Sequence, residues 1–367
     1  MYKPPSGLAG YTMPAEYAPH RATLMIWPSR PGSWGRDPRA AQAAFVRVFE
    51  AVTQSEDLYL LAGPDQSPAA RAATAHLPRV KLLCIDSDDA WARDVGPTFV
   101  RHPQKGLCGI SWSFNAWGGT VDGLYADWRK DDALAAAFCR AVGLPCASAA
   151  PFVLEGGSIH SDGEGTLLVT ESCLLSPGRN PQLSRREIEE TLCAWLGAQK
   201  VLWLPRGIYN DETNEHVDNV CAFVAPANVV LAWTDNTADE QYALSAASLA
   251  YLQRQTDAKG RPLTVHRLPV PDHPILCSAG DCAAYDFAPG EDVRTPGERL
   301  AASYVNFYFT NGAVLVPQFG GENAESDARA CRILQQLCPD RRVTGLPARE
   351  ILQGGGNIHC ITQQIPL

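Results

Sequence analysis

The segment from Thr166 to Leu204 shows a plan that recurs along the chain. It starts with Thr166-Leu167-Leu168-Val169-Thr170, turns at Ser176-Pro177-Gly178, continues through 183–196 and ends with Lys200-Val201-Leu202-Trp203-Leu204. Short apolar runs bounded by turn residues are typical of buried strands, and the longer amphipathic stretch between them indicates a helix. The segment therefore predicts a strand–turn–helix–strand unit.

The same plan recurs in four other segments. The predicted first strand and helix of each unit are Thr23–Trp27 with 40–52, Gly109–Trp112 with 133–142, Val229–Trp233 with 243–255, and Ala313–Pro317 with 328–337. Alternating strands and helices are usual in a doubly wound parallel sheet. Five units averaging about 73 residues also fit radial repetition around an axis, so the spacing leaves both arrangements open.

The composition narrows the class of protein. Of 367 residues, 46% are hydrophobic, and the formal net charge is −9. An acidic chain disfavours nucleic acid and anionic membranes as partners and suits a cationic substrate. The sequence has no run of about 18 apolar residues, and its start lacks the apolar core of a secretory signal, so we expect neither a transmembrane helix nor a signal peptide.

The twelve cysteines follow neither a disulfide scaffold nor a zinc motif. Most lie in apolar runs, where a reduced thiol packs as a small hydrophobic group, and this pattern indicates a reducing cytoplasm. No Cys-x-x-Cys pair occurs, and no Gly-rich phosphate loop follows the first predicted strand. We therefore expect no metal and no nucleotide cofactor.

Two nearly identical phrases lie about 200 residues apart. Glu155-Gly156-Gly157-Ser158-Ile159-His160 puts a carboxylate before its glycines, and Gly354-Gly355-Gly356-Asn357-Ile358-His359-Cys360 puts a thiol after them. Two more polar clusters surround Asp94 and His216. The intervals Asp94–Glu155 and Glu155–His216 are both 61 residues, and His216–Cys360 is 144, close to two such intervals. The clusters therefore occupy equivalent places in successive units, with one unit contributing little.

Each of these polar residues also has a purely structural interpretation. His216 and Asp218 could be a strand-end pair, Cys360 a packed thiol, Asp94 the partner of Arg93, and Glu155 a turn residue. Because these residues occupy equivalent positions in the repeated units, a shared site is favoured instead. In an extended segment His216 and Asp218 would face the same side, where the imidazole can exchange protons near neutral pH.

One thiol, one imidazole and three carboxylates together suit a guanidinium substrate. A peptidase has no use for several anions near its acyl carbon, and carboxylates beside a thiol raise its pKa unless the substrate is itself a cation. The planar guanidinium fork accepts paired carboxylates, which would fix its central carbon in front of the thiolate.

The longest motifs resemble those of the agmatine deiminase family, one of the guanidine-modifying enzymes. The resemblance runs from about residue 10 to the C-terminus and rests on Met13–Glu16, 92–97, 114–119, 154–160, 207–214, 216–219 and 354–364. It implies an α/β pentein fold, a propeller of five αβ units around a pseudo-fivefold axis, with residues 1–367 forming a single catalytic domain. It also implies hydrolysis of agmatine to N-carbamoylputrescine and ammonia without a cofactor, in putrescine biosynthesis or agmatine catabolism.

The resemblance implies a role for each catalytic candidate. Cys360 would form a covalent amidino adduct, and His216 would protonate the departing ammonia and then activate water. Asp94 and Asp218 would clamp the guanidinium nitrogens, and Glu155 would hold His216 and the substrate.

Other residues are expected to shape the pocket. Trp91 would form a wall near Asp94, Gly355 would let the backbone approach the substrate, and Glu212 would bind the ammonium tail. Some relatives in this family carry Gly in place of Glu215, whose side chain we expect to point away from the site. Symmetry statistics favour a homodimer.

Three other functions stay open at this point. The same thiol chemistry could act on peptidylarginine or free arginine, although the full-length motif match favours agmatine. An amine rather than water could resolve the Cys360 adduct, which would make the protein an amidinotransferase. The third is a catalytically inactive scaffold, which would be expected to have lost Cys360 or His216.

Overall fold

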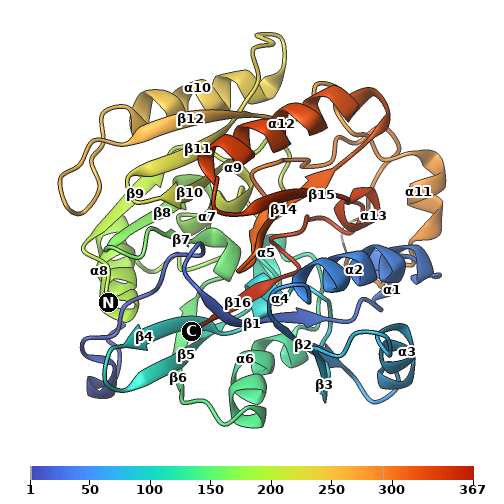
Figure 1. Ribbon diagram of the computed structural model, residues 1–367, viewed down its shortest axis with the longest axis horizontal. Coiled ribbons are helices and arrows are strands. Elements are labelled where there is room, and N and C mark those ends of the chain that lie inside the picture. Colours follow the sequence, from blue (N-terminus) through green and yellow to red (C-terminus); the bar gives the residue numbers. More distant parts are fainter. Residues whose placement is uncertain (1, 292) are drawn as a thin grey trace.

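The computed structural model describes residues 2–291 and 293–367. Its described strands form five separate small sheets (Figure 1). These are β16 (Gln363–Pro366) with β1 (His20–Ile26), β2 (Asp57–Ala62) and β3 (Val80–Cys84); β4 (Thr98–His102), β5 (Gly106–Ser113) and β6 (Cys146–Val153); β7 (His160–Ser161), β8 (Thr166–Thr170) and β9 (Lys200–Leu204); β10 (Cys221–Ala225), β11 (Asn228–Trp233) and β12 (Thr264–Pro269); and β13 (Tyr308–Phe309), β14 (Ala313–Gln318) and β15 (Arg342–Pro347). The five sheets rule out a single doubly wound sheet.

Every sheet repeats one hydrogen-bonding plan. An antiparallel pair comes first, as in β4–β5, and a parallel pair follows, as in β5–β6. A long helix joins the two parallel strands in each unit: α2 (Arg39–Val52), α6 (Arg129–Ala141), α8 (Arg185–Leu196), α10 (Glu240–Leu252) and α12 (Ala324–Leu337). This arrangement confirms the predicted strand–helix–strand units, which follow one another around the centre of the molecule in Figure 1.

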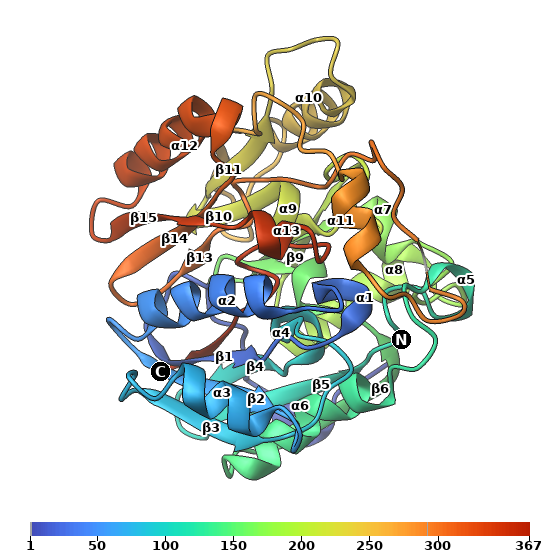
Figure 2. The same ribbon diagram turned by 90° about the vertical axis from the view of Figure 1, so that its right-hand side faces the viewer.

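The C-terminal strand completes the first unit. β16 pairs antiparallel with β1, placing Pro366 opposite His20, and β1 pairs in parallel with β2. Figure 1 shows β16 lying beside β1. The first and last strands of the described chain therefore share one sheet and close the ring. In Figure 2, α10 and α12 lie along one edge of the molecule, and α3 and α6 lie along the opposite edge.

Local sequence explains where the long helices begin and end. Before α8, the Ser184 side chain accepts from the Glu187 backbone while Glu187 bonds back to Ser184, and Gly197 ends the helix in the left-handed region. The prediction for α10 was displaced by three residues. The Asp239 side chain accepts from the Gln241 backbone, so the helix begins at Glu240 and ends at Leu252.

Short helices fill the connections. They are α1 (Pro31–Trp34), α3 (Ser67–Ala73), α4 (Ala92–Val95), α5 (Gly119–Asp122), α7 (Glu171–Leu174), α9 (Val217–Val220), α11 (Ala279–Ala284) and α13 (Arg349–Leu352), with the 3-10 turns η1 (Ser6–Leu8), η2 (Gly156–Ser158) and η3 (Gly321–Asn323). Not one of the helices in the described part of the chain has the length and apolar character needed to cross a membrane.

Candidate active site

Each unit places polar residues just ahead of its antiparallel strand. Asp94 lies on α4 before β4, Glu155 precedes η2 and β7, and His216 and Asp218 lie at α9 before β10. Cys360 lies in the loop before β16. The structure brings all five of these predicted residues together in the interior, where Cys360 is the most exposed at 7%.

Gly157 lies where side chains from two neighbouring units meet. A Cβ atom there would lie 2.6 Å from His216 Nδ1 and 2.9 Å from both Asp218 Oδ2 and Asp94 Oδ1. Real side chains do not tolerate such distances, so this position requires glycine. The Gly157 N–H also donates to Asp94 Oδ1 at 2.9 Å. The repeated glycines thus let the backbone approach the catalytic candidates directly.

The expected extended geometry of His216 and Asp218 was wrong. Val217–Val220 forms one helical turn, α9, and His216 stands just before it. Both side chains still reach the space beside Gly157, but the turn gives them different partners. His216 Nε2 therefore lies 3.6 Å from Glu155 Oε2, whereas Asp218 Oδ2 contacts His359 Nδ1 at 2.8 Å and lies 3.6 Å from the Cys360 sulfur.

Glu155 has a buried partner that sequence reasoning missed. Arg179 Nε lies 2.8 Å from Glu155 Oε1, and neither side chain is exposed. The same guanidinium donates to the backbone oxygens of Trp117 and Thr213, so it ties both segments to Glu155. Burial raises the pKa of Glu155, but Arg179 and His216 together hold it below its usual range. The only sequence signal was the turn just before Arg179.

The pKa values of Asp94 and His216 are both raised above their ordinary values. Burial raises the pKa of Asp94 to about 6; the carboxylates of Asp218 and Glu155 add to the rise, and His216 opposes it. Burial alone would lower the pKa of His216, but Asp94, Cys173 and Glu155 bring it well above its usual value. His216 is therefore an imidazolium at neutral pH, able to donate a proton.

The alternative interpretation of Asp94 as the partner of Arg93 was wrong. Arg93 Nη1 lies 3.2 Å from Glu16 Oε1 instead, and both side chains are buried. Asp94 Oδ2 accepts from Trp117 Nε1 at 2.9 Å. Asp94 is thus held by neutral donors on one side and remains available to a cationic ligand.

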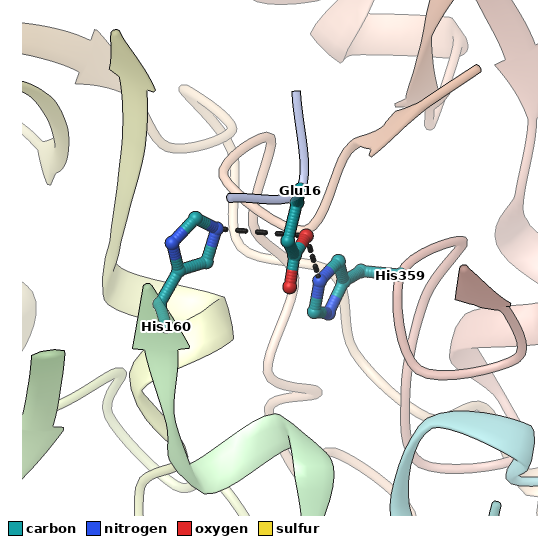
Figure 3. A group of neighbouring side chains, drawn as sticks. All are labelled: Glu16, His160 and His359. Atoms are coloured by element: carbon teal, nitrogen blue, oxygen red, sulfur yellow. Dashed lines mark hydrogen bonds and ion pairs between the residues drawn. The ribbon is translucent and has the colours of Figure 1, made fainter. Parts of the chain in front are cut away.

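Glu16, His160 and His359 form a second buried cluster behind the site (Figure 3). Glu16 Oε2 lies 2.7 Å from His359 Nε2 and 3.5 Å from His160 Nε2. Both nitrogens of His359 therefore contact carboxylates, since its Nδ1 contacts Asp218. Both must carry protons, which makes His359 a cation. Burial lowers the pKa of His160 to about 4, so this histidine is neutral.

Two buried groups in the described chain bring enough ligand atoms together for a metal ion: Glu16 with His160 and His359, and Glu155 with Cys173 and His216. In both groups a guanidinium already lies on the carboxylate, Arg93 on Glu16 and Arg179 on Glu155. The guanidinium groups of Arg93 and Arg179, together with protonated histidines, therefore balance the negative charge of Glu16 and Glu155. The first group continues into an alternating chain of charges that ends at Asp218 beside Cys360.

The Cys360 sulfur opens into a narrow pocket. Its lining is Trp91, Asp94, Trp117, Leu124, Glu212, Thr213, Gly354, Gly355, Gly356 and Cys360. A wider cavity of about 270 Å³ shares Trp91 and Glu212 with it and leads outward. The expected pocket residues Trp91, Gly355 and Glu212 therefore lie beside Asp94 and Cys360.

Glu212 lies where the narrow pocket meets the wider cavity. Its carboxylate pairs with Arg294, at 2.6 Å between Oε1 and Nη2, a contact that the sequence did not reveal. Gly355 is left-handed (φ 118°), and a Cβ there would lie 2.8 Å from Glu212 Oε2. As expected, Glu215 points away from the site, toward Arg206. Its φ of 70° explains why glycine also suits this position.

Comparison with known proteins defines the class. Residues 12–366 match the family model described as Porphyromonas-type peptidyl-arginine deiminase, and the chain belongs to this family. Similar proteins include a candidate agmatine deiminase of Selenomonas ruminantium, 54% identical over 97% of this chain and 96% of the relative, and the agmatine deiminase of Stutzerimonas stutzeri, 50% identical over 97% of this chain and 96% of the relative. The solved agmatine deiminase of Enterococcus faecalis has a TM-score of 0.93 at 42% identity, covering 97% of this chain and 96% of that one. These matches confirm the resemblance and the pentein fold.

Proposed function

We propose that this protein hydrolyses agmatine to N-carbamoylputrescine and ammonia through a covalent Cys360 adduct, with residues 1–367 acting as one catalytic domain. The observation that carries the proposal is the distribution of charge along the pocket. Asp94 lies beside the thiol, and Glu212 lies at the outer end. Agmatine is a cation at both ends, so carboxylates at two depths match it. Identity near 50% to agmatine deiminases supports the same substrate.

Binding of the guanidinium prepares the nucleophile. Burial, Asp218 and Asp94 raise the pKa of Cys360 well above its usual value, so the unliganded protein holds a thiol. A guanidinium clamped by Asp94 and Asp218 neutralises the two carboxylates that disfavour the thiolate. The thiol then gives its proton to solvent water, because His216 is already protonated, and Sγ faces the central carbon. Substrate charge is therefore part of nucleophile activation.

The first half of the reaction releases ammonia. The Cys360 thiolate attacks the central guanidinium carbon and forms a C–S bond. His216 gives its proton to a terminal nitrogen, the C–N bond breaks, and ammonia leaves an amidino group on the sulfur. Glu155 keeps His216 oriented and charged for this step, since it lies 3.6 Å from Nε2.

The second half regenerates the thiolate. His216, now neutral, takes a proton from a water molecule, and the oxygen attacks the amidino carbon. The C–S bond breaks, the added hydroxyl gives its remaining proton to solvent as it becomes the ureido carbonyl, the product leaves, and Cys360 returns as a thiolate. One water is consumed for each ammonia released, and nothing is oxidised or reduced.

Product analysis tests this reaction. Agmatine should yield ammonia and N-carbamoylputrescine in equal amounts, and adding a primary amine should not change that ratio. An amidinotransferase would instead form a new guanidino compound from the amine and little ureido product. That result would overturn hydrolysis while keeping the Cys360 adduct.

Glu212→Gln should raise the agmatine KM about tenfold or more, equivalent to about 1.4 kcal/mol, at modest cost to kcat. The glutamine keeps the side-chain shape but cannot balance the ammonium charge. Steady-state kinetics with agmatine measure the effect. An unchanged KM would place the tail elsewhere.

Arg294→Gln is the matched control for that change. Arg294 holds the Glu212 carboxylate, so its guanidinium competes with the substrate ammonium for the same anion. Removing it should lower the agmatine KM or leave it unchanged. A rise in KM equal to that of Glu212→Gln would show that the ion pair matters as structure and not as the tail site.

Acid should weaken agmatine binding through Asp94. Because the pKa of Asp94 is raised to about 6, the carboxylate is lost as pH falls through that value, and a protonated carboxyl cannot clamp a cation. The KM for agmatine should therefore rise below about pH 6, which kinetics between about pH 5 and pH 8 would measure. A constant KM over this range would contradict the clamp.

The location and assembly belong to the same proposal. A free Cys360 thiol requires a reducing environment, which supports a cytoplasmic enzyme. The homodimer stays a prediction from symmetry statistics. Agmatine consumption and N-carbamoylputrescine release suit a step in putrescine formation or agmatine breakdown.

A further inference from the structure

The unit that was expected to contribute little supplies Asn306. This residue precedes β13, the place that carries catalytic candidates in the other units. It is completely buried, and its Nδ2 lies 3.2 Å from the Cys360 sulfur. All five units therefore place a polar side chain at the centre, and the fifth touches the nucleophile directly.

The orientation of the Asn306 amide follows from its other contacts. Its Oδ1 lies 3.0 Å from the His359 backbone nitrogen and 3.3 Å from the Cys360 backbone nitrogen. Backbone N–H groups can only donate, so the oxygen must face them. The NH₂ group must then face the sulfur, which also lies 3.5 Å from Oδ1. An amide NH₂ is a permanent donor, whatever the pH.

Charge around the sulfur makes such a donor valuable. Asp218 Oδ2 lies 3.6 Å from Sγ, Asp94 lines the same pocket, and the cation His359 is turned toward Asp218. His216 faces Asp94 and Glu155. The charged groups nearest the sulfur are therefore carboxylates, which disfavour a thiolate. Asn306 instead directs a neutral N–H donor toward the sulfur.

We propose that Asn306 is a further catalytic residue, which donates a hydrogen bond to the Cys360 thiolate and fixes the position of the sulfur. This inference rests on the proposed role of Cys360 as nucleophile. The bond strengthens whenever negative charge gathers on sulfur, before attack and again when the C–S bond breaks. Its two backbone contacts hold the nucleophile loop at the same time.

Alkylation of Cys360 by iodoacetamide tests the proposal. The rate is followed by mass spectrometry of the Cys360 peptide as a function of pH, since only the thiolate reacts. Asn306→Ala should move the rate curve upward by about one pH unit or more, so that alkylation at a fixed pH is about tenfold slower. The kcat for agmatine should fall while KM changes little.

Asn311→Ala is the matched control. Asn311 holds the His20 backbone through its Oδ1 and Nδ2, each at 2.8 Å, and its backbone N–H donates to Glu56 rather than to Cys360. Its alkylation curve should coincide with that of the unmodified protein. A folded Asn306→Ala protein with an unmoved curve would overturn the proposal.

A second variant covers the case in which Asn306→Ala does not fold. Asn306→Asp keeps an oxygen for the two backbone N–H groups but replaces the donor with a carboxylate, so its curve should move upward at least as far as that of Asn306→Ala. A curve at the original position would overturn the proposal. Failure of the unmodified protein to turn over agmatine, with Cys360 still alkylated and the curves displaced, would count against the proposed function alone.

Discussion

Replacing Cys360 with serine should lower agmatine turnover by about four orders of magnitude or more. A serine hydroxyl cannot ionise among Asp94, Asp218 and Glu155, and the nearby His216 already carries its proton and cannot serve as the base. Single-turnover assays would measure the loss, and circular dichroism would show that the fold is intact. Ammonia release faster than about one hundredth of the original rate would mean that the thiol is not the nucleophile.

Cys338→Ser provides the control for this substitution. Cys338 is also buried, at 3% exposure, but it packs in the core between β14 and α12 and lines no part of the pocket. Its turnover of agmatine should stay close to that of the unmodified protein. The comparison separates loss of the nucleophile from the cost of placing a hydroxyl in the interior.

His216→Gln should lower kcat by about two to four orders of magnitude with little change in KM. Glutamine can still bond to Glu155, but it cannot carry the proton that leaves with ammonia or accept one from water. Both halves of the reaction therefore slow. Steady-state kinetics would give kcat and KM separately.

His266 provides the control for His216→Gln. His266 on β12 is only half-buried, contacts Asn228 and lines neither the narrow pocket nor the wider cavity. His266→Gln should leave kcat unchanged. A kcat for His216→Gln within about tenfold of the original would remove His216 from proton transfer.

The repeated plan of the fold was readable because each unit codes its own strands and helix. Apolar runs such as Thr166–Thr170 match β8 at both ends. Four of the five sheets pair strands that are consecutive in the chain, but strand spacing alone left both a radial and a doubly wound arrangement open. β16 pairs with β1 across nearly the whole chain, and no local pattern specifies that contact.

The site was predictable to the extent that its residues stood out from their surroundings. Asp94, Glu155, His216 and Cys360 interrupt apolar sequence at regular intervals, and they do meet. Asn306 stands alone between Val305 and Phe307, with no motif around it. Its one signal was its position, just before the short strand β13, which matches the positions of the others.

Local geometry accounts for the remaining error. His216-Val217-Asp218 alternates like a strand, yet the segment forms the single turn α9. A lone turn carries too few residues for helical periodicity to appear in the sequence. The consequence is functional, because His216 and Asp218 serve different partners.

The most direct measurement compares agmatine, free arginine and an N-blocked arginine peptide under identical conditions, with ammonia and ureido product followed for each. We expect efficient turnover of agmatine alone, because the Glu212 carboxylate favours an ammonium tail and disfavours the α-carboxylate of arginine. Preferential turnover of arginine or the peptide would keep Cys360 and its carboxylates as the catalytic centre. It would contradict agmatine as the substrate and Glu212 as its selector.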